Sequence, residues 1–251
     1  LYGIDEKSYC ISLGIEQVLL GLLLRGELNT YLQIGSHGKS GAVFFKSYDN
    51  KYIIKTIHES EAKLLRSIVD QYYEHISTSH SVLVPIFNLF KIRSKDNLNI
   101  MNLVVMPNIL NTPNEISELY DVKGSITGRK VAPEKRKPGV PLKDAEFNQR
   151  NMKLSDNLKR LVAGSIARDS KFLEQQGLMD YSFLVGIHKV SEGTMNAIPN
   201  SETTTDGGYI SADKTEIYYF GIIDFLVQWK TKKKIEQAFK SLSSPGEHLS
   251  P

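Results

Sequence analysis

Two short apolar stretches each carry an acidic residue that could take part in chemistry. The stretch from Leu178 to His188 reads LMDYSFLVGIH and contains Asp180, with a serine two positions later. The stretch from Tyr218 to Leu226 reads YYFGIIDFL and carries Asp224 near its end. An ionised carboxylate in apolar surroundings is costly unless something charged offsets it, so the two acids predict a site for a metal ion and phosphate groups.

The spacing around the first acid allows two interpretations. Positions two apart lie on one face of an extended chain, so the Asp180 carboxylate and the Ser182 hydroxyl are expected to point the same way. A structural explanation stays open, in which Asp180 only turns the chain after Gly177. The second acid at the end of a second apolar run favours the active-site interpretation.

A lysine inside an apolar run is the basic counterpart of these acids. Lys55 lies within KYIIKTI, residues 51–57, shortly after the Gly- and Ser-rich stretch GSHGKSG at residues 35–41. Glycines let a backbone approach phosphate groups closely and leave N–H groups free to bind them. A buried lysine needs a partner, for which Glu61 is a candidate. In the alternative interpretation Lys55 points to water from an edge strand, and Glu61 only stabilises a helix N-terminus.

Helices and strands must hold these residues in place. Apolar residues at helical spacing predict helices at residues 15–28, from Ser60 to Ile76, and from Ser155 or Asp156 to the glycine at 177. Strands are expected at residues 83–92 and 100–106. Pro107 ends the second of these strands, and we expect it to free backbone groups of Asn108 and Ile109 for a ligand.

Composition narrows the class of protein. The chain has 251 residues, of which 41% are hydrophobic, as suits one globular domain with a sizeable core. One cysteine excludes an internal disulfide and indicates a reducing compartment. The net charge is +3, so a basic surface must come from local clustering. No apolar run reaches the ~20 residues that span a bilayer, and no signal peptide is recognisable. Because the sequence starts at Leu1, we expect it to be part of a longer chain.

The motifs together resemble the phosphatidylinositol phosphate kinase family. Six pieces occur in the family's order, a combination far more specific than any one of them: GKSG, YIIKTI, YDVKGSITGR, MDYSFLVGIH, FGIIDFL and KTKKKIE. The resemblance implies a two-lobed α+β fold with antiparallel sheets, distantly similar in plan to protein kinases. It implies an N-lobe over residues 1–107, a C-lobe over 108–251 and an activation loop from residue 228. Residues 191–214 are poor in apolar side chains and are expected to form a flexible surface loop.

The resemblance also implies roles for individual residues, with ATP and Mg²⁺ as cofactors. Asp180 is similar to the catalytic-loop Asp, Asp224 to the metal-binding Asp, and Lys55 to the lysine that pairs the ATP phosphates. Lys123 and Arg129 match the element beside the transferred phosphate and the lipid head group. The phosphate-covering loop is matched by Gly38, Ser40 and Gly41. The adenine-binding hinge is matched by Met106, Asn108 and Ile109. The activation loop is matched by Lys232, Lys233 and Lys234.

The expected activity is transfer of phosphate from ATP to a phosphatidylinositol monophosphate in an anionic membrane surface. Glu236, shortly after the three lysines, matches members that phosphorylate the 4-phosphate lipid at the 5-hydroxyl. A 5-phosphate 4-kinase and a 3-phosphate 5-kinase are the alternatives within the family. Two alternative functions lie outside this activity: a kinase-shaped membrane scaffold and a kinase for soluble inositol phosphates. We expect a cytoplasmic protein, peripheral on the cytosolic face of membranes, that binds no nucleic acid; a homodimer is left open.

The sequence departs from the family pattern in two motifs. DVKGS replaces the usual DLKGS, and SFLVG replaces SLLVG. Both changes exchange one apolar residue for another, so they are expected to be harmless. The stretch from Ile11 to Gln33 is unlike the family.

Overall fold

The computed structural model describes residues 5–13, 32–33, 42–78, 80–93, 100–125, 127–197, 199 and 201–229. The expected helix at 15–28, the glycine-rich loop with Gly38, Ser40 and Gly41, and the activation-loop residues Lys232, Lys233, Lys234 and Glu236 lie outside these residues. Among the described helices, none combines the length and apolar character needed to cross a membrane.

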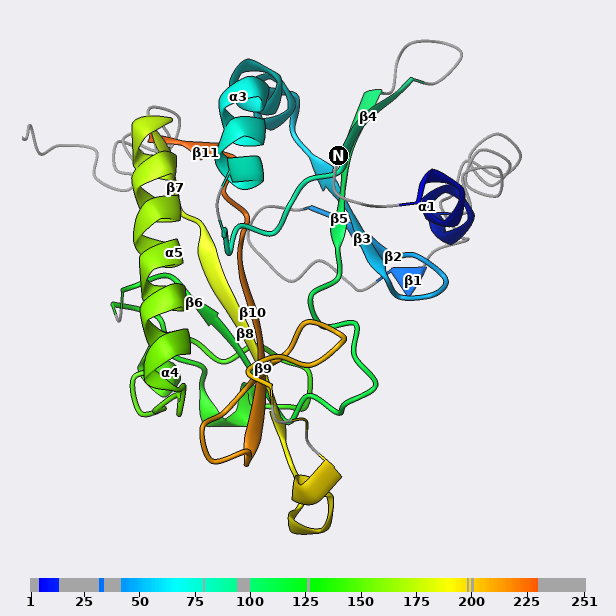
Figure 1. The fold of residues 1–251 in the computed structure, drawn as a ribbon. Coiled ribbons are helices and arrows are strands. Elements are labelled where there is room, and N and C mark those ends of the chain that lie inside the picture. Colours follow the sequence, from blue (N-terminus) through cyan, green and yellow to red (C-terminus); the bar gives the residue numbers. More distant parts are fainter. Residues whose placement is uncertain are drawn as a thin grey trace, which may run out of the picture. The chain divides into compact units, whose positions relative to one another are not determined.

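The described chain contains three sheets and a small number of helices (Figure 1). The strands are β1 Leu32–Gln33, β2 Phe44–Lys46, β3 Tyr52–Ile57, β4 Asn88–Arg93, β5 Ile100–Pro107, β6 Glu118–Val122, β7 Leu178–Met179, β8 Ser182–Lys189, β9 Tyr209–Ile210, β10 Glu216–Ile223 and β11 Val227–Gln228. The helices are α1 Glu6–Leu13, α3 Glu59–Thr78, α4 Asp144–Phe147 and α5 Asp156–Gln175, with short 3₁₀ turns η1 Pro133–Lys135 and η2 Glu192–Ala197.

Sheet order follows β1-β2-β3-β5-β4, β6-β8-β10-β9 and β11-β7. Neighbouring strands of the first sheet are antiparallel, as are the pairs β9–β10 and β7–β11. Helices beside antiparallel sheets confirm the expected α+β class.

The chain groups into two compact units. Unit 1 comprises residues 1–67, 84–117 and 186–219, and unit 2 comprises 68–83, 118–185 and 220–251. These units differ from the segments expected before and after residue 107, because each collects pieces from several parts of the chain.

A small apolar core joins α1 to the first sheet in unit 1. Leu13 at the end of α1 packs with Phe45 of β2 and Ile54 of β3, and Figure 1 shows α1 beside these strands. Tyr9 on α1 meets the Tyr52 ring edge-on, with 5.0 Å between ring centroids. Apolar burial of this kind fixes β3, the strand that carries Lys55.

Both long helices match the sequence expectation. α3 begins one residue before the predicted Ser60 and runs two residues past Ile76. α5 follows Ser155, whose hydroxyl oxygen accepts the Leu158 N–H, as an N-cap does. After α5 the chain turns at Gly177 with φ +65°, a conformation that glycine adopts without a steric cost.

Two segments differ from the expectation. The strand predicted at 83–92 begins only at Asn88, because Pro85 has no N–H to give to a ladder.

Residues 201–211 are not an irregular surface loop. They include β9, which pairs with β10, and Ile210 is only 4% exposed. Asp206 accepts hydrogen bonds from the hydroxyls of Thr112 and Tyr219, and these tie the segment to unit 1.

Candidate active site

The backbone at both predicted acids has an unusual conformation. Asp180 follows β7 with φ 64°, and Asp224 lies between β10 and β11 with φ 60°. A non-glycine residue held at positive φ costs on the order of 1–3 kcal/mol, and such strain clusters at functional sites. Because β7 and β11 are antiparallel with Met179 opposite Val227, the two acids lie at the same end of this strand pair. The structure therefore brings together the two residues that the sequence singled out.

Ser182 does not share the direction of Asp180. The positive φ of Asp180 interrupts the extended chain, and β8 starts only at Ser182. Ser182 is 2% exposed and hydrogen-bonds to the Asp121 carboxylate, whereas the Asp180 side chain is 35% exposed. The expectation that both polar groups point the same way is wrong, because alternation requires an unbroken strand.

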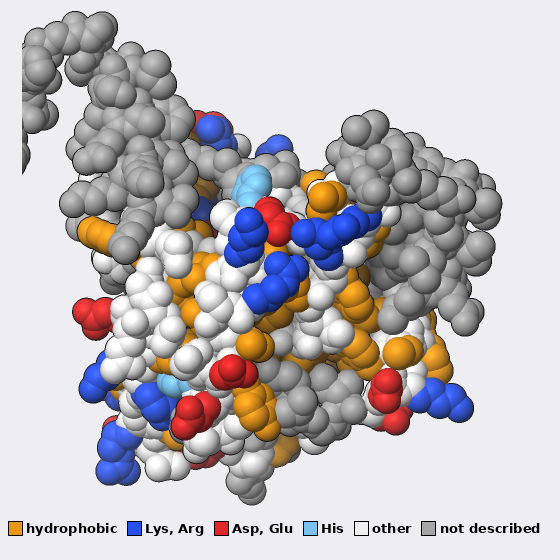
Figure 2. All heavy atoms as spheres, turned by 90° about the horizontal axis from the view of Figure 1, so that it is seen from above, with side chains coloured by type: hydrophobic (Ala, Val, Ile, Leu, Met, Phe, Trp, Pro, Cys, Tyr) orange, Lys and Arg blue, Asp and Glu red, His pale blue; other side chains and the backbone are white. Residues whose placement is uncertain are grey.

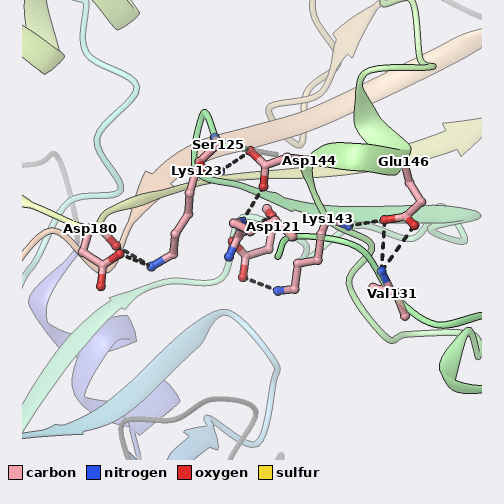
Figure 3. Close-up of polar contacts among 9 residues, drawn as sticks. Asp121, Lys123, Ser125, Val131, Lys143, Asp144, Glu146 and Asp180 are labelled. Carbon is pink, nitrogen blue, oxygen red and sulfur yellow. Dashed lines mark hydrogen bonds and ion pairs between the residues drawn. The ribbon is translucent and has the colours of Figure 1, made fainter. Parts of the chain in front are cut away.

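Lys123 binds Asp180 directly. Its ammonium group donates to the backbone oxygen of Asp180 at 2.6 Å and to the carboxylate Oδ1 at 2.9 Å (Figure 3). Lys123 follows β6, so two segments distant in sequence meet at this pair. A positive charge at this distance offsets the carboxylate charge in partly buried surroundings.

Asp144 organises the turn that contains Lys123. Its carboxylate accepts the backbone N–H groups of Lys123 at 2.9 Å and Ser125 at 3.1 Å (Figure 3). It also accepts the Nε–H of Arg129. Burial alone would raise the pKa of Asp144, but the hydrogen bond from Arg129 and the two backbone donors lower it below its ordinary value. Asp144 is therefore a buried, ionised anchor.

Arg129 joins this anchor to Asp121. The Arg129 guanidinium donates through Nε to Asp144 and through Nη2 to the backbone oxygen and Oδ1 of Asp121. Lys143 donates to the other Asp121 oxygen at 2.7 Å. Burial would raise the pKa of Asp121, but hydrogen bonds from Lys143 and Ser182 and the two nearby cations hold it below its usual range.

Lys55 lies on a central strand of unit 1. β3 pairs with β2 on one side and β5 on the other, and Lys55 is 8% exposed. Its ammonium nitrogen is 5.5 Å from the centroid of the Phe44 ring. The alternative of an edge-strand lysine that points to water is wrong, since both edges of β3 are occupied.

Glu61 has a local role at the start of α3. Its carboxylate accepts the backbone N–H of His58 at 2.7 Å, which satisfies a donor just before the helix. This geometry supports the helix-terminus interpretation of Glu61. Its pairing with Lys55 stays a prediction.

The predicted hinge residues follow β5. Met106 is paired with Ile53 of β3. The Asn108 N–H donates to the Lys51 oxygen at 2.8 Å, and the Asn108 oxygen accepts the Asn111 N–H at 2.9 Å. The expectation that Pro107 frees the Asn108 backbone is wrong, because the ladder continues one residue past the proline. Adenine binding by Met106, Asn108 and Ile109 stays a prediction.

Sequence reasoning missed Asp144, Lys143 and Asp121 as members of the site. Asp144 opens the four-residue helix α4, where a carboxylate in the first turn is normally read as helix stabilisation. Only the placement of α4 beside the turn after β6 shows that it binds Lys123. Nothing in the local pattern LKDAEF distinguishes this acid from a surface residue.

The chain is similar in sequence to known proteins along most of its length. The family model for phosphatidylinositol-4-phosphate 5-kinase matches residues 26–208 and 197–251. A phosphatidylinositol 4-phosphate 5-kinase of Plasmodium falciparum is 33% identical, over 99% of this chain and 16% of that protein. A probable phosphatidylinositol phosphate kinase of Dictyostelium discoideum is 32% identical, over 96% of this chain and 42% of its own length.

Another relative is named for a different specificity. The mouse phosphatidylinositol 5-phosphate 4-kinase type-2 alpha is 29% identical, over 82% of this chain and 62% of that protein. The chain thus spans less than two thirds of the length of each of these relatives. With the family model matching most of its residues, the chain belongs to the phosphatidylinositol phosphate kinase family.

Proposed function

We propose that this chain carries the catalytic core of an ATP-dependent lipid kinase. It transfers phosphate to the inositol ring of a phosphatidylinositol monophosphate, taking the 4-phosphate lipid to the 4,5-bisphosphate. The observation that carries the proposal is the Asp180–Lys123 pair, with Asp180 in a strained conformation beside the strand connection that holds Asp224. Family membership supports the lipid as the acceptor.

The residues of unit 2 would act on the acceptor side of the reaction. The exposed part of the Asp180 carboxylate orients the inositol hydroxyl and accepts its proton. Lys123 holds that carboxylate in place and supplies positive charge where negative charge spreads over the transferred phosphoryl group. Phosphoryl transfer asks a protein mainly for such positioning and charge neutralisation, so no covalent step on the enzyme is required.

The donor side uses Lys55 and a divalent cation. Lys55 sits in a firmly paired strand and would bind the ATP phosphates. No cluster of three or more acidic, His or Cys side chains that could hold a metal occurs among the described residues. A single carboxylate such as that of Asp224 fits Mg²⁺, which is usually held by one or two carboxylates together with substrate phosphates and water. Asp224 would hold the ion, which would supply positive charge against the ATP phosphates.

The lysine run after residue 229 supports a membrane-bound substrate. Each Lys or Arg near an anionic surface contributes about 1 kcal/mol, so Lys232, Lys233 and Lys234 together supply roughly 3 kcal/mol. That amounts to weak, reversible docking on the cytosolic face of a membrane. A soluble inositol phosphate would gain nothing from this run. The run lies outside the described residues; on the face drawn in Figure 2, several Lys and Arg side chains lie beside acidic side chains.

A transfer assay tests the proposal. The chain is incubated with labelled ATP, Mg²⁺ and vesicles that contain one of the three monophosphorylated lipids, and the products are identified. We expect most transfer with the 4-phosphate lipid. Faster transfer with the 5-phosphate lipid would replace this specificity by that named for the mouse relative. No transfer to any of the three, with folded protein and bound vesicles, would favour a membrane scaffold.

A further inference from the structure

Asp144 is almost entirely buried, yet no substrate-facing role is open to it. The residue is 2% exposed, and its two carboxylate oxygens are bound from within the protein. One oxygen accepts two backbone N–H groups, from Lys123 and Ser125, and the other accepts the Arg129 Nε–H. A carboxylate with three donors in a buried place is a strong and specific anchor, because hydrogen bonds to an ionised group are roughly twice as strong as neutral ones.

The two backbone donors lie on either side of a glycine. Gly124 has φ +74°, so the chain reverses between Lys123 and Ser125 and points both N–H groups at one place. Successive N–H groups around a left-handed residue form a concave site for an anion, and the Asp144 carboxylate fills this one. The turn that carries Lys123 is thereby fixed by a residue 21 positions further along the chain.

Fixing the turn matters for the reach of Lys123. A lysine side chain has a flexible four-carbon stem, so its ammonium group is placed accurately only if the backbone at its base is held. Here the base is held by Asp144 and the tip by the oxygens of Asp180, at 2.6 and 2.9 Å. Figure 3 shows this line of contacts, in which Lys123 extends from the turn beside Asp144 toward Asp180.

Arg129 closes the arrangement on the other side. Its Nε and Nη2 donate to Asp144 and Asp121, and Lys143 donates to Asp121. These contacts keep Asp144 in place and balance its charge. Removing Asp144 would leave Arg129 with one of its two acidic partners.

We propose that Asp144 is a positioning residue for phosphoryl transfer, which acts through Lys123 by holding the turn at Lys123–Ser125 so that the ammonium group meets Asp180. The inference rests on the proposed function, since it assigns a cause for the position of one group in that site. Asp144 is assigned no direct contact with ATP or lipid, because it is 2% exposed and both its carboxylate oxygens are bound within the protein.

The test is a double-mutant cycle with a matched control. Asp144→Asn keeps the size of the side chain but removes the charge that binds Arg129 and the turn. We expect kcat to fall by about 100-fold, as for a displacement of about 1 Å in a reacting group, with KM for ATP little changed. In the Lys123→Met background the same substitution should cause no further loss, because two residues that act as one unit are not additive.

Glu146→Gln is the control. Glu146 lies in the same short helix and binds the backbone N–H groups of Val131 and Lys143, and not the turn at Lys123. We expect it to lower the melting temperature and to leave kcat close to wild type. An equal loss of kcat in both single variants, or full additivity with Lys123→Met, would overturn the proposal.

Amide hydrogen exchange separates this inference from the proposed function, because it needs no activity. In Asp144→Asn the Lys123 and Ser125 amides should exchange faster, whereas Glu146→Gln leaves them protected. Unchanged exchange in Asp144→Asn contradicts the positioning role even if the enzyme is active. If the wild-type chain transfers no phosphate but these amides respond as expected, the proposed function fails and the anchor remains. If Asp144→Asn is unfolded, Asp144→Glu is measured instead, because it keeps the charge but displaces it. The Lys123 and Ser125 amides should again exchange faster, and kcat should again fall.

Discussion

Ile210 gives a quantitative test of whether residues 201–211 belong to the core. The side chain is 4% exposed on β9, and its ladder partner is Ile217 of β10, which is 2% exposed. Ile210→Ala removes buried methyl and methylene groups and leaves a cavity, at a cost of about 2–4 kcal/mol. For a chain of this length each kcal/mol lowers the melting temperature by roughly 2–4 °C, so the expected fall is about 4–16 °C.

Thermal unfolding followed by circular dichroism measures this change. Thr205→Ala, at an exposed threonine of the same segment, is the control and should stay within about 0.5 kcal/mol of wild type. An irregular surface loop would give the same small change for both variants. A fall below about 2 °C for Ile210→Ala would therefore refute the packing argument and restore the loop interpretation.

Three further predictions concern the site. Lys55→Met and Asp224→Asn should each lower turnover roughly 100- to 1,000-fold with an unchanged circular dichroism spectrum; near wild-type transfer by either variant would contradict the active-site assignment. The lowered pKa values of Asp121 and Asp144 predict how the free energy of unfolding, measured with urea, depends on pH. The contribution of these carboxylates is fully present at neutral pH and is lost as pH falls through and below about 4, because the unfolded chain takes up protons first. A free energy of unfolding that rises on acidification would contradict this prediction. Glu236→Ala should shift preference from the 4-phosphate toward the 5-phosphate lipid, since a carboxylate can both bind free hydroxyls and repel a misplaced phosphate; an unchanged product ratio would refute the selective role of Glu236.

Elements set by local pattern could be predicted from the sequence. The apolar spacing and the serine cap define α5, and the β-branched run before Pro107 defines β5. Lys55 and Asp224 could be identified because each is a lone charge in an apolar stretch of sequence, a signal that depends only on neighbours in the chain. The order of residues 201–211 could not be predicted, because their composition is polar and a hydrogen bond to Asp206 comes from Thr112, 94 positions away in the chain.

Asp144 could not be predicted because its signal is entirely tertiary. Its three hydrogen-bond donors lie 15 to 21 positions earlier in the chain, and an acidic residue is common at the start of an exposed helix. By contrast, the strained backbone at Asp180 was hidden in a run that looks like one continuous strand. Alternation would have turned its carboxylate with Ser182, which is buried against Asp121. The break in the strand is what leaves the Asp180 carboxylate partly exposed and within reach of Lys123, so the departure from regular structure is itself the feature that makes the site usable.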